Sequence, residues 1–428
     1  MPWFPSFCSA GLLALLVAAC GSGGDQAGHA PSRTELRGLH ILRLTGTPYE
    51  MGRQQGELMT SEIQELADFT DQDQGYSLLL AVAETNGLTD AALEYSYPEV
   101  LDECRGMVEA VEAAGVQNWS QRKCVTAAYL LVVLENTVGW TQGGCSQFVA
   151  AGSATKDGAL VHARNLDWPP LPPLVHNPTL IVRRPQGGIP YVEVGFPGEV
   201  FSLSGINENG LVVALNEAYA REDKDEQGRS HPQMARRILE QAESVAEAET
   251  LIAAQDHASA ETIVISDAAA GEAAVFEISA NHMGIRRLSA DGVVYATNHF
   301  VQPEMQGIDV ERTADDDSLT RYARFEQLLE PGGANSILGQ IDLAAAVGVL
   351  RDTYNPYTGE SHPPELIDGG GSIGNNGTVH AMVFLPARRA LYVAMGEQPV
   401  PPRPFVGFSL DELFEEPNAA PADPAQIE

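Results

Sequence analysis

The chain contains few basic residues: 25 lysines and arginines stand against 58 aspartates and glutamates among 428 residues, which gives a formal charge of −33. Such a charge repels phosphate backbones and anionic membrane surfaces, so nucleic acid is disfavoured as a partner. The sequence contains no phosphate-binding loop and no dinucleotide fingerprint, and its 10 histidines show no metal-ligand spacing. We therefore expect neither a cofactor nor a metal ion.

Long apolar runs are also missing beyond the N-terminus. Residues 10–19 are apolar and end at Cys20, and a loose tract follows over 21–31. This pattern predicts a bacterial lipoprotein signal peptide over residues 1–20, with Cys20 lipidated and serving as the only membrane anchor. We expect an exported protein on the periplasmic or outer-membrane face of the cell envelope. No lysine or arginine precedes Arg33, so ordinary secretion or a different start site is the alternative.

Cysteine is scarce, with five residues in the whole chain. Cys8 would leave with the signal peptide and Cys20 would take the lipid, which leaves an odd number in the exported body. An oxidising compartment favours a disulfide. Cys104 and Cys124 are the expected pair because both lie in a predicted helical region, and Cys145 would remain a free thiol. The alternative is that Cys104 and Cys124 are simply buried as small apolar residues.

The hydrophobic period changes once along the chain. After a short strand at 40–44, apolar residues recur at helical spacing. The helices expected here cover residues 50–69, 91–114 and 122–134. After Cys145, short β-branched runs typical of strands take over and pair at hairpin spacing. These runs lie at residues 148–151, 159–162, 179–182, 191–194, 211–215, 262–265, 274–278, 293–296, 378–384 and 390–394. Helical patterns intervene at residues 232–241, 245–254, 319–329 and 343–350.

These patterns indicate an α+β fold in which packed antiparallel sheets are flanked by helices. Residues 21–144 form a linker and a helical segment, and residues 145–400 form the sheet domain. The stretch 401–428 is rich in proline, alanine and glutamate. We expect it to be a surface strap or a disordered tail.

The change of period falls at Gly143-Gly144-Cys145-Ser146. Glycines permit backbone angles closed to other residues and leave the preceding carbonyl open to a thiol. We therefore expect Cys145 to attack the carbonyl of Gly144, so that water releases a new chain that begins at Cys145. The freed α-amine, with a reference pKa of about 7.7–8.0, would then act as a base beside the nucleophile. The alternative is a buried cysteine after a glycine turn.

A second motif, Arg164-Asn165-Leu166-Asp167-Trp168, follows on the turn after the strand at 159–162. With this motif the chain from Cys145 onwards resembles the N-terminal-nucleophile (Ntn) amidases, in particular the choloylglycine hydrolases and the acyl-CoA:6-aminopenicillanic-acid acyltransferases. The first group opens its mature chain with cysteine and then carries this motif. The second has a helical pro-segment that ends in a self-cleaved Gly-Cys bond. The resemblance implies a four-layered αββα sandwich, with a helical pro-segment that stays associated as a second chain.

Three further segments match these families in the same order. The segment from Asn207 resembles one that ends in an oxyanion-hole asparagine, here Asn216. The segment 296–300 resembles one whose asparagine, here Asn298, binds the substrate carbonyl and the amine of the nucleophile. A later Ser-x-x-Arg element makes Arg321 the match to the second arginine of the family.

The chemistry of amide cleavage explains these residue types. Neutral amide donors such as those of Asn216 and Asn298 stabilise an oxyanion. A carboxylate near the new N-terminus orients the α-amine, which is the role expected of Asp167, and a guanidinium near sulfur favours the thiolate, which is the role expected of Arg164. For each residue the alternative is a structural ion pair or a turn amide.

We therefore expect an exported hydrolase of linear amides that acts on N-acyl compounds with an apolar acyl group and a small polar amine side. Trp168, Phe201 and Phe300 are expected near the acyl chain, and the glycine-rich loop 369–377 is a possible lid. One alternative is an acyltransferase that passes the acyl group to an amine. Another is a non-catalytic binding lipoprotein of the cell surface. A conventional cysteine protease would need His299 as the partner of Cys145.

Overall fold

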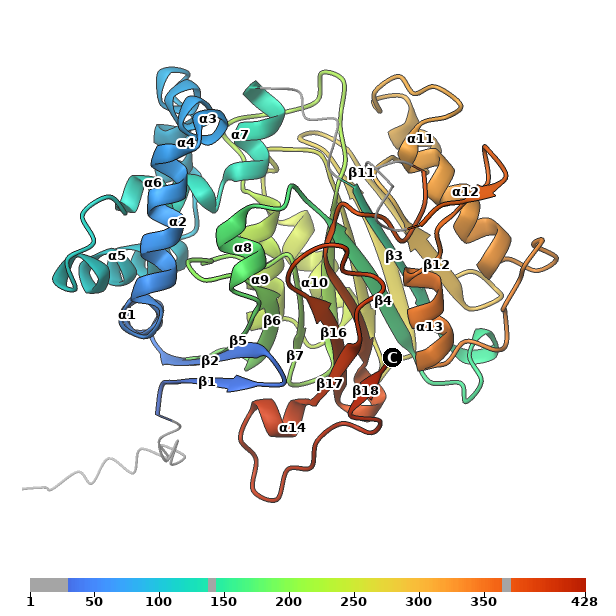
Figure 1. Cartoon of the computed structure of the whole chain (residues 1–428). Helices are drawn as coiled ribbons and strands as arrows, with labels where there is room; N and C mark the ends of the chain where they lie inside the picture. The colour runs from blue at the N-terminus through green and yellow to red at the C-terminus, as the bar shows by residue number, and fades with distance from the viewer. Residues whose placement is uncertain (1–29, 138–143, 364–370) are drawn as a thin grey trace, which may run out of the picture.

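The computed structural model describes residues 30–137, 144–363 and 371–428 and shows two β-sheets packed between two groups of helices (Figure 1). The predicted signal peptide with Cys8 and Cys20 lies outside the described residues, and so does Gly143. No helix within the described ranges is long and apolar enough to cross a membrane.

The smaller of the two sheets carries Cys145 and has seven strands, all antiparallel to their neighbours. In spatial order these strands are β12 (Val293–Ala296), β3 (Gly144–Ala150), β4 (Val161–Asp167), β15 (Thr378–Leu385), β16 (Ala390–Met395), β17 (Phe405–Ser409) and β18 (Gln426–Ile427). Strands β17 and β18 come from the tail that was expected to be a strap or disordered. That expectation is wrong, because Phe405 packs on one face of the sheet and Phe408 on the other, so the tail continues the sheet beyond β16.

The larger sheet has nine strands and joins the start of the chain to the later part. In spatial order they are β1 (Ser32–Leu36), β2 (Leu39–Gly46), β5 (Thr179–Pro185), β6 (Tyr191–Gly195), β7 (Ser204–Asn207), β8 (Leu211–Glu217), β9 (Glu261–Asp267), β10 (Glu272–Ile278) and β11 (Met283–Arg287). All neighbours are antiparallel except β2 and β5, which run parallel. The sheets are thus antiparallel, as predicted, except at this pair. A parallel pair needs a long crossover connection, and the chain between Gly46 and Thr179 provides it.

Helices form the two outer layers. Those before Cys145 are α1 (Pro48–Leu58), α2 (Thr60–Gln72), α3 (Gln74–Thr85), α4 (Leu88–Tyr95), α5 (Pro98–Ala113), α6 (Gln121–Ala127) and α7 (Leu130–Thr137). Those after it are α8 (Pro172–His176), α9 (His231–Gln241), α10 (Val245–Ala253), α11 (Pro303–Gln306), α12 (Asp317–Leu329), α13 (Leu343–Leu350) and α14 (Leu410–Leu413). A small hairpin of β13 (Tyr354–Asn355) and β14 (Glu360–Ser361) stands apart from both sheets.

The buried apolar side chains define four layers. Between the sheets, Val182 and Val192 pack with Phe384 and Val393. The outer face of the nine-stranded sheet is covered by helices of the N-terminal segment together with α9 and α10. The outer face of the seven-stranded sheet is covered by α12 and α13, which stand on the opposite side in Figure 1. The order helix, sheet, sheet, helix confirms the predicted αββα sandwich.

Helices α1 and α5 cross at a distance that only glycine permits. A Cβ atom on Gly52 would stand 2.0 Å from the carbonyl oxygen of Glu103, and one on Gly106 would stand 2.1 Å from the carbonyl oxygen of Tyr49. The backbones of the two helices are therefore in direct contact, and each of these glycines is required by its partner helix.

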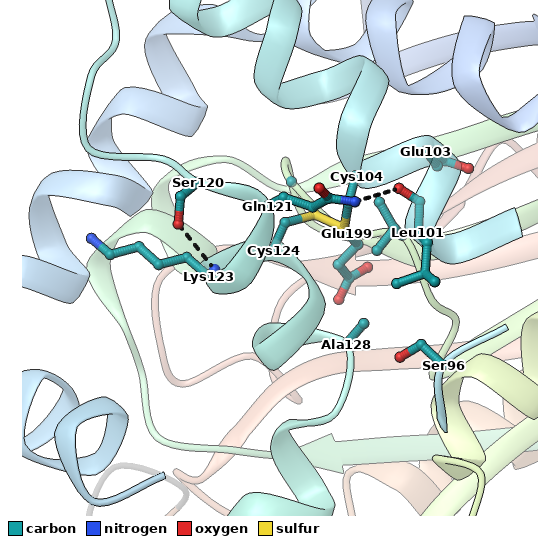
Figure 2. Close-up of a disulfide and its surroundings, with 12 residues drawn as sticks. Ser96, Leu101, Glu103, Cys104, Ser120, Gln121, Lys123, Cys124, Ala128 and Glu199 are labelled. Carbon is teal, nitrogen blue, oxygen red and sulfur yellow. Dashed lines mark hydrogen bonds between the residues drawn. A yellow bond between two sulfur atoms is a disulfide. The ribbon is translucent and has the colours of Figure 1, made fainter. Parts of the chain in front are cut away.

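The predicted disulfide is present and joins α5 to α6. Cys104 and Cys124 are bonded with their Cα atoms 5.8 Å apart, and both are buried (Figure 2). Beside the bridge, the side-chain amide of Gln121 donates to the carbonyl oxygen of Leu101 at 3.3 Å. The disulfide lies wholly within the helical segment before Cys145.

A buried charge cluster connects that segment to the rest of the chain. Glu103 on α5 pairs with Arg183 on β5 and lies 2.7 Å from Nη1 of Arg236 on α9. Arg183 Nε also lies 2.8 Å from Glu193 on β6, and Arg236 Nε lies 2.9 Å from Glu240 on its own helix. The two arginines and Glu103 are completely or almost completely shielded from solvent. The two cations and three carboxylates offset each other's charge, whereas any one alone would be costly to bury.

Candidate active site

Cys145 is the second residue of β3, and the Arg-Asn-Leu-Asp stretch lies opposite it on β4. The register pairs Cys145 with Leu166, Gln147 with Arg164 and Gly144 with Asp167. Side chains alternate along a strand, so Arg164 shares a face of the sheet with Cys145. The expected position of this motif on a turn is corrected, because Arg164 to Asp167 are inside the strand.

Cys145 carries a free thiol, the only one among the described residues, and it is 4% exposed. Arg164 Nη2 lies 3.5 Å from its Sγ. The same guanidinium donates to the carbonyl oxygen of Leu203 at 3.1 Å and contacts Ser204 Oγ and the carbonyl oxygen of Leu215. Burial raises the pKa of the Cys145 thiol, and the charges of Arg164 and Arg321 act in the opposite direction. The thiol is therefore neutral at rest and needs a base before it can attack.

Asn298 holds the backbone nitrogen of the same cysteine. The N–H of Cys145 donates to Asn298 Oδ1 at 2.8 Å, and Asn298 Nδ2 donates to the carbonyl oxygen of Glu217 at 2.7 Å. The backbone N–H of Asn298 donates to Ser318 Oγ at 2.7 Å. These contacts fix the orientation of the Asn298 side-chain amide. They also place it at the Cys145 nitrogen, which would become an α-amine if the chain were cut before Cys145.

Arg321 on α12 binds both Cys145 and Asn298. Its Nη1 donates to the carbonyl oxygen of Cys145 at 2.6 Å and to Ser146 Oγ at 2.9 Å, and its Nη2 donates to Asn298 Oδ1 at 2.8 Å. Burial alone would lower the pKa of Arg321, but the nearby carboxylates of Asp317 and Asp167 outweigh it and raise the pKa. The guanidinium is therefore a fixed positive charge beside Cys145.

Asp167 faces the residue before Cys145. A Cβ atom on Gly144 would stand 2.9 Å from Asp167 Oδ2 and 3.3 Å from Arg321 Nη2. Thr378 Oγ1 donates to Asp167 Oδ1 at 2.6 Å, and Asn375 Nδ2 donates to Oδ2 at 2.9 Å. Burial raises the pKa of Asp167 to about 6, against the charge of Arg321 and these two hydrogen bonds. Only glycine fits at position 144 without displacing the carboxylate.

Asn216 lies beside the backbone of Cys145. Its Nδ2 donates to the carbonyl oxygens of Ala296 and Thr297 at 3.1 Å and lies 3.4 Å from that of Cys145, while its Oδ1 accepts from Gln147 Nε2 at 2.7 Å. It is fully buried and is not among the residues that line the cavity at the thiol. The oxyanion-hole role of Asn216 stays a prediction.

The site therefore brings together Cys145, Arg164, Asp167, Asn298 and Arg321, with Asn216 behind them. Sequence reasoning missed Asn375 and Thr378, which hold Asp167. The dipeptide Asn375-Asn376 looked like part of a flexible loop, and no pattern of residues linked it to a strand more than 200 positions earlier.

Cys145 lines a cavity of about 150 Å³ whose walls are mainly apolar. Trp168 and Phe201 line this cavity, as predicted, but Phe300 does not. Phe300 packs in a separate cluster with Met305, so its expected contact with an acyl chain is wrong. Part of the wall comes from the helical segment before Cys145, which contributes Leu66, Thr70, Tyr76, Leu80, Trp119, Lys123, Thr126, Ala127, Leu130 and Leu131.

The histidine that a conventional cysteine protease would need does not lie at the thiol. His299 contacts Thr297 Oγ1 and Ser318 Oγ and does not line the cavity, and burial lowers its pKa to about 3. The first residues of the loop 369–377 lie outside the described residues. The part of that loop that is described packs behind Asp167 through Asn375.

A buried thiol at the start of a strand in an αββα sandwich, with an arginine at its sulfur and an asparagine at its nitrogen, is an arrangement suited to acyl chemistry. Residues 153–399 match the model of the acyl-coenzyme A:6-aminopenicillanic acid acyl-transferase family, which is more than half of the chain. The chain belongs to this family. Membership places it among enzymes of amide hydrolysis or acyl transfer.

The chain is also similar to individual proteins. A curated protein of Archaeoglobus fulgidus without an assigned function is 24% identical over 335 residues, which are 68% of this chain and 55% of that protein. The chain thus spans about half the length of this relative. Among solved structures, the N-acylethanolamine-hydrolyzing acid amidase ortholog of Caenorhabditis elegans has 22% identity and a TM-score of 0.39 over 56% of this chain and 93% of its own. Penicillin V acylase from Agrobacterium tumefaciens has 17% identity and a TM-score of 0.38 over 63% and 87%.

Proposed function

We propose that the chain is a self-activating hydrolase of linear amides in N-acyl compounds, with Cys145 as the nucleophile after cleavage between Gly144 and Cys145. The observation that carries this proposal is the position of Cys145. Its sulfur touches a guanidinium and lines an apolar cavity, while its nitrogen is bound by Asn298. A merely structural cysteine needs neither contact.

The same geometry supports the proposal of self-cleavage. The Cys145 sulfur attacks the carbonyl carbon of Gly144, the bond from that carbon to the Cys145 nitrogen breaks, and the thiol proton ends on this nitrogen. Water then hydrolyses the thioester, which returns a free thiol and leaves a carboxylate on Gly144. The close packing of Gly144 against Asp167 and Arg321 supports this step, because it holds the peptide in one place.

Turnover repeats this chemistry on a substrate. The new α-amine of Cys145 takes the thiol proton, and sulfur attacks the substrate amide carbon. The amine half of the substrate leaves with the proton, and water hydrolyses the acyl-thioester. Asn298 keeps the α-amine in place, and Arg164 lowers the cost of the thiolate. Asp167 lies where it can bind the protonated α-amine.

The cavity supports an apolar acyl group. Its walls carry leucine, phenylalanine and tryptophan side chains from both sides of the cleavage site. Burial of each methylene of an acyl chain there contributes about 0.8 kcal/mol. Because helices α2, α3, α6 and α7 supply much of the wall, we propose that the first fragment stays in place as part of the enzyme.

Export is supported by the disulfide as well as by the N-terminal pattern. A buried bond between Cys104 and Cys124 fits an oxidising compartment. We propose that the protein acts in the cell envelope as a lipoprotein anchored at Cys20. Outside the cytoplasm water is abundant and acyl-CoA is scarce, which favours hydrolysis over acyl transfer.

Intact mass of the purified protein tests the self-cleavage. We expect two fragments that meet between Gly144 and Cys145, and a single chain for Cys145→Ala, which lacks the attacking sulfur. Splitting of the Cys145→Ala chain at the same bond would show that another group performs the cleavage and would remove Cys145 from its role.

An assay of released amine tests the reaction. A panel of N-acyl amino acids, N-acyl homoserine lactones, conjugated bile acids and phenylacetyl amides should include a substrate for the cleaved protein and none for Cys145→Ala. The competing function, favoured by the description of the family, is acyl transfer. Turnover only when a thioester donor and an amine acceptor are both supplied would establish that function and reject the hydrolase.

A further inference from the structure

Two glutamates face each other across the strands beside the nucleophile. Glu217 ends β8 and Glu261 begins β9, and the antiparallel register pairs them directly. Side chains at such a pair stand on one face about 5 Å apart at Cβ, and like charges there are destabilising. Glu261 is completely buried and Glu217 is 7% exposed, and both line the cavity that contains Cys145.

Neither carboxyl group is fully satisfied by the protein. Within the described ranges, both oxygens of Glu261 and Oε2 of Glu217 are buried without a hydrogen-bond partner. The hydroxyl of Tyr219 interacts with Glu217. Arg164 is the cation that acts on Glu261, but its hydrogen bonds go to Cys145, Ser204 and backbone carbonyls. A buried carboxyl group without a donor is costly, so this pair calls for a ligand that brings donors.

A third carboxyl group on the same cavity shows what a satisfied one looks like. Glu199 also lines the cavity, and its Oε2 accepts the backbone N–H of Phe196 at 3.1 Å. Glu199 thus has a backbone donor, whereas Glu261 in the same cavity has none among the described residues.

The pair stands at the reacting end of the cavity. Asn298 Nδ2 donates to the carbonyl oxygen of Glu217 at 2.7 Å, while its Oδ1 accepts the N–H of Cys145 at 2.8 Å. One amide side chain thus bridges Glu217 to the nucleophile. The apolar side chains of the helical segment line the same cavity. An acyl chain among these helices leaves the amine half of the substrate next to the nucleophile and the two glutamates.

We propose that Glu217 and Glu261 form a binding site for an ammonium group on the amine half of the substrate, so that the preferred substrates are N-acyl derivatives of diamines. This inference rests on the proposed function. An alkylammonium has three N–H donors and a positive charge, which match the unpartnered oxygens and offset the charge of the ionised carboxylates. The formal charge of −33 of the chain also attracts cations.

Ammonium binding should release protons. Burial raises the pKa of Glu217 to about 8 and holds that of Glu261 well above its ordinary value. Burial therefore favours the neutral form of both carboxyl groups in the empty site, and a bound cation favours the ionised form. Calorimetric binding enthalpies should depend on the ionisation enthalpy of the buffer for a cationic ligand and not for a neutral one.

The test uses three amides that differ in one terminal group: N-decanoyl-1,2-diaminoethane, N-decanoylethanolamine and N-decanoylpropylamine. For the cleaved protein we expect kcat/KM on the diamine derivative to exceed that on the propyl compound by about tenfold or more, since a buried charge pair contributes more than about 1.4 kcal/mol. Glu261→Gln and Glu217→Gln should each reduce this ratio at least about fivefold. Glu199→Gln is the matched control and should leave the ratio unchanged.

Binding to the inactive Cys145→Ala chain separates this proposal from the reaction. If the cleaved protein hydrolyses no amide but Cys145→Ala prefers the diamine derivative, and Glu261→Gln in that background removes the preference, the ammonium site holds and the hydrolase fails. If amides are hydrolysed and the three compounds are equivalent, the site is wrong. Preference for the ethanolamine compound without proton release would reassign the pair to a hydroxyl group and also overturn the proposal.

Discussion

At the scale of single residues, Asn298 is the side chain that connects Cys145 to the rest of the site. It accepts from the Cys145 nitrogen and from Arg321, and it donates to the carbonyl oxygen of Glu217. Asn298→Ala removes all three contacts, so the α-amine base loses its position. We expect kcat to fall about 10²–10³-fold, as for the loss of one oxyanion-hole donor, with KM changed little. Steady-state kinetics on the best substrate of the panel measures both constants. A rise in KM with kcat unchanged would assign Asn298 to substrate binding alone.

Asn216→Ala is the informative comparison. In the uncleaved chain its amide points to the carbonyl oxygens of Cys145, Ala296 and Thr297. If it donates to the oxyanion after cleavage, kcat falls in the Asn216 variant as in the Asn298 variant while the melting temperature holds. If it only supports the backbone, the melting temperature falls and kcat does not.

Sequence reasoning reached the residues that carry local motifs and missed those that act through long-range contacts. Cys145 and Arg164 were found because glycines and a charged motif mark them in the chain, and the register of β3 and β4 places them together. Asn375 and Glu261 have no such mark. Their importance comes from a contact with Asp167 and from a facing partner on the next strand, which depend on the topology of the sheets.

At the scale of elements, the backbone contact between α1 and α5 determines how closely these two helices pack. A Cβ atom on Gly52 would stand 2.0 Å from a backbone oxygen, which no side-chain movement can relieve. We expect Gly52→Ala to lower the free energy of unfolding by about 1–3 kcal/mol, the usual cost of overpacking. Denaturant unfolding of the Cys145→Ala chain measures it without interference from cleavage.

Gly348 on α13 is the matched control for this substitution. It is also helical, but it is exposed and a Cβ atom there meets nothing within 4 Å. Gly348→Ala should therefore stabilise the protein by up to about 1 kcal/mol through helix propensity. Equal effects of the two substitutions would show that α1 and α5 are not in backbone contact.

Elements with strong hydrophobic periods were predictable, and those that depend on an edge or a neighbour were not. The pattern at residues 343–350 matches α13 to the residue. Strand β17 was missed because its Pro-rich surroundings resemble a tail, and it becomes a strand only through the open edge of β16. The single helix expected over 50–69 is two helices, α1 and α2, which meet at Met59.

At the scale of the whole molecule, the proposed cleavage site lies within a single structural unit. The residues before Cys145 supply β1 and β2 to the nine-stranded sheet and much of the cavity wall to the site. Glu103 of this segment is enclosed by Arg183 and Arg236 of the later chain. The disulfide, in contrast, joins two residues of the same segment and does not link the two proposed fragments.

This arrangement predicts two fragments that stay together without a covalent bond. After cleavage they should elute as one species in size-exclusion chromatography, yet separate as two bands in denaturing gels without a reducing agent. Loss of one member of a buried ion cluster costs about 3–5 kcal/mol, so Glu103→Gln should make the fragments dissociate at a clearly lower urea concentration. Glu112→Gln, the same substitution at an exposed position of α5, should not. Fragments that dissociate in native buffer would show that the helical segment does not stay bound. Equal urea resistance of the two variants would show that the ion cluster does not hold the fragments together. Because the cavity at Cys145 is lined from both fragments, any loss of association should remove amide hydrolysis at the same urea concentration.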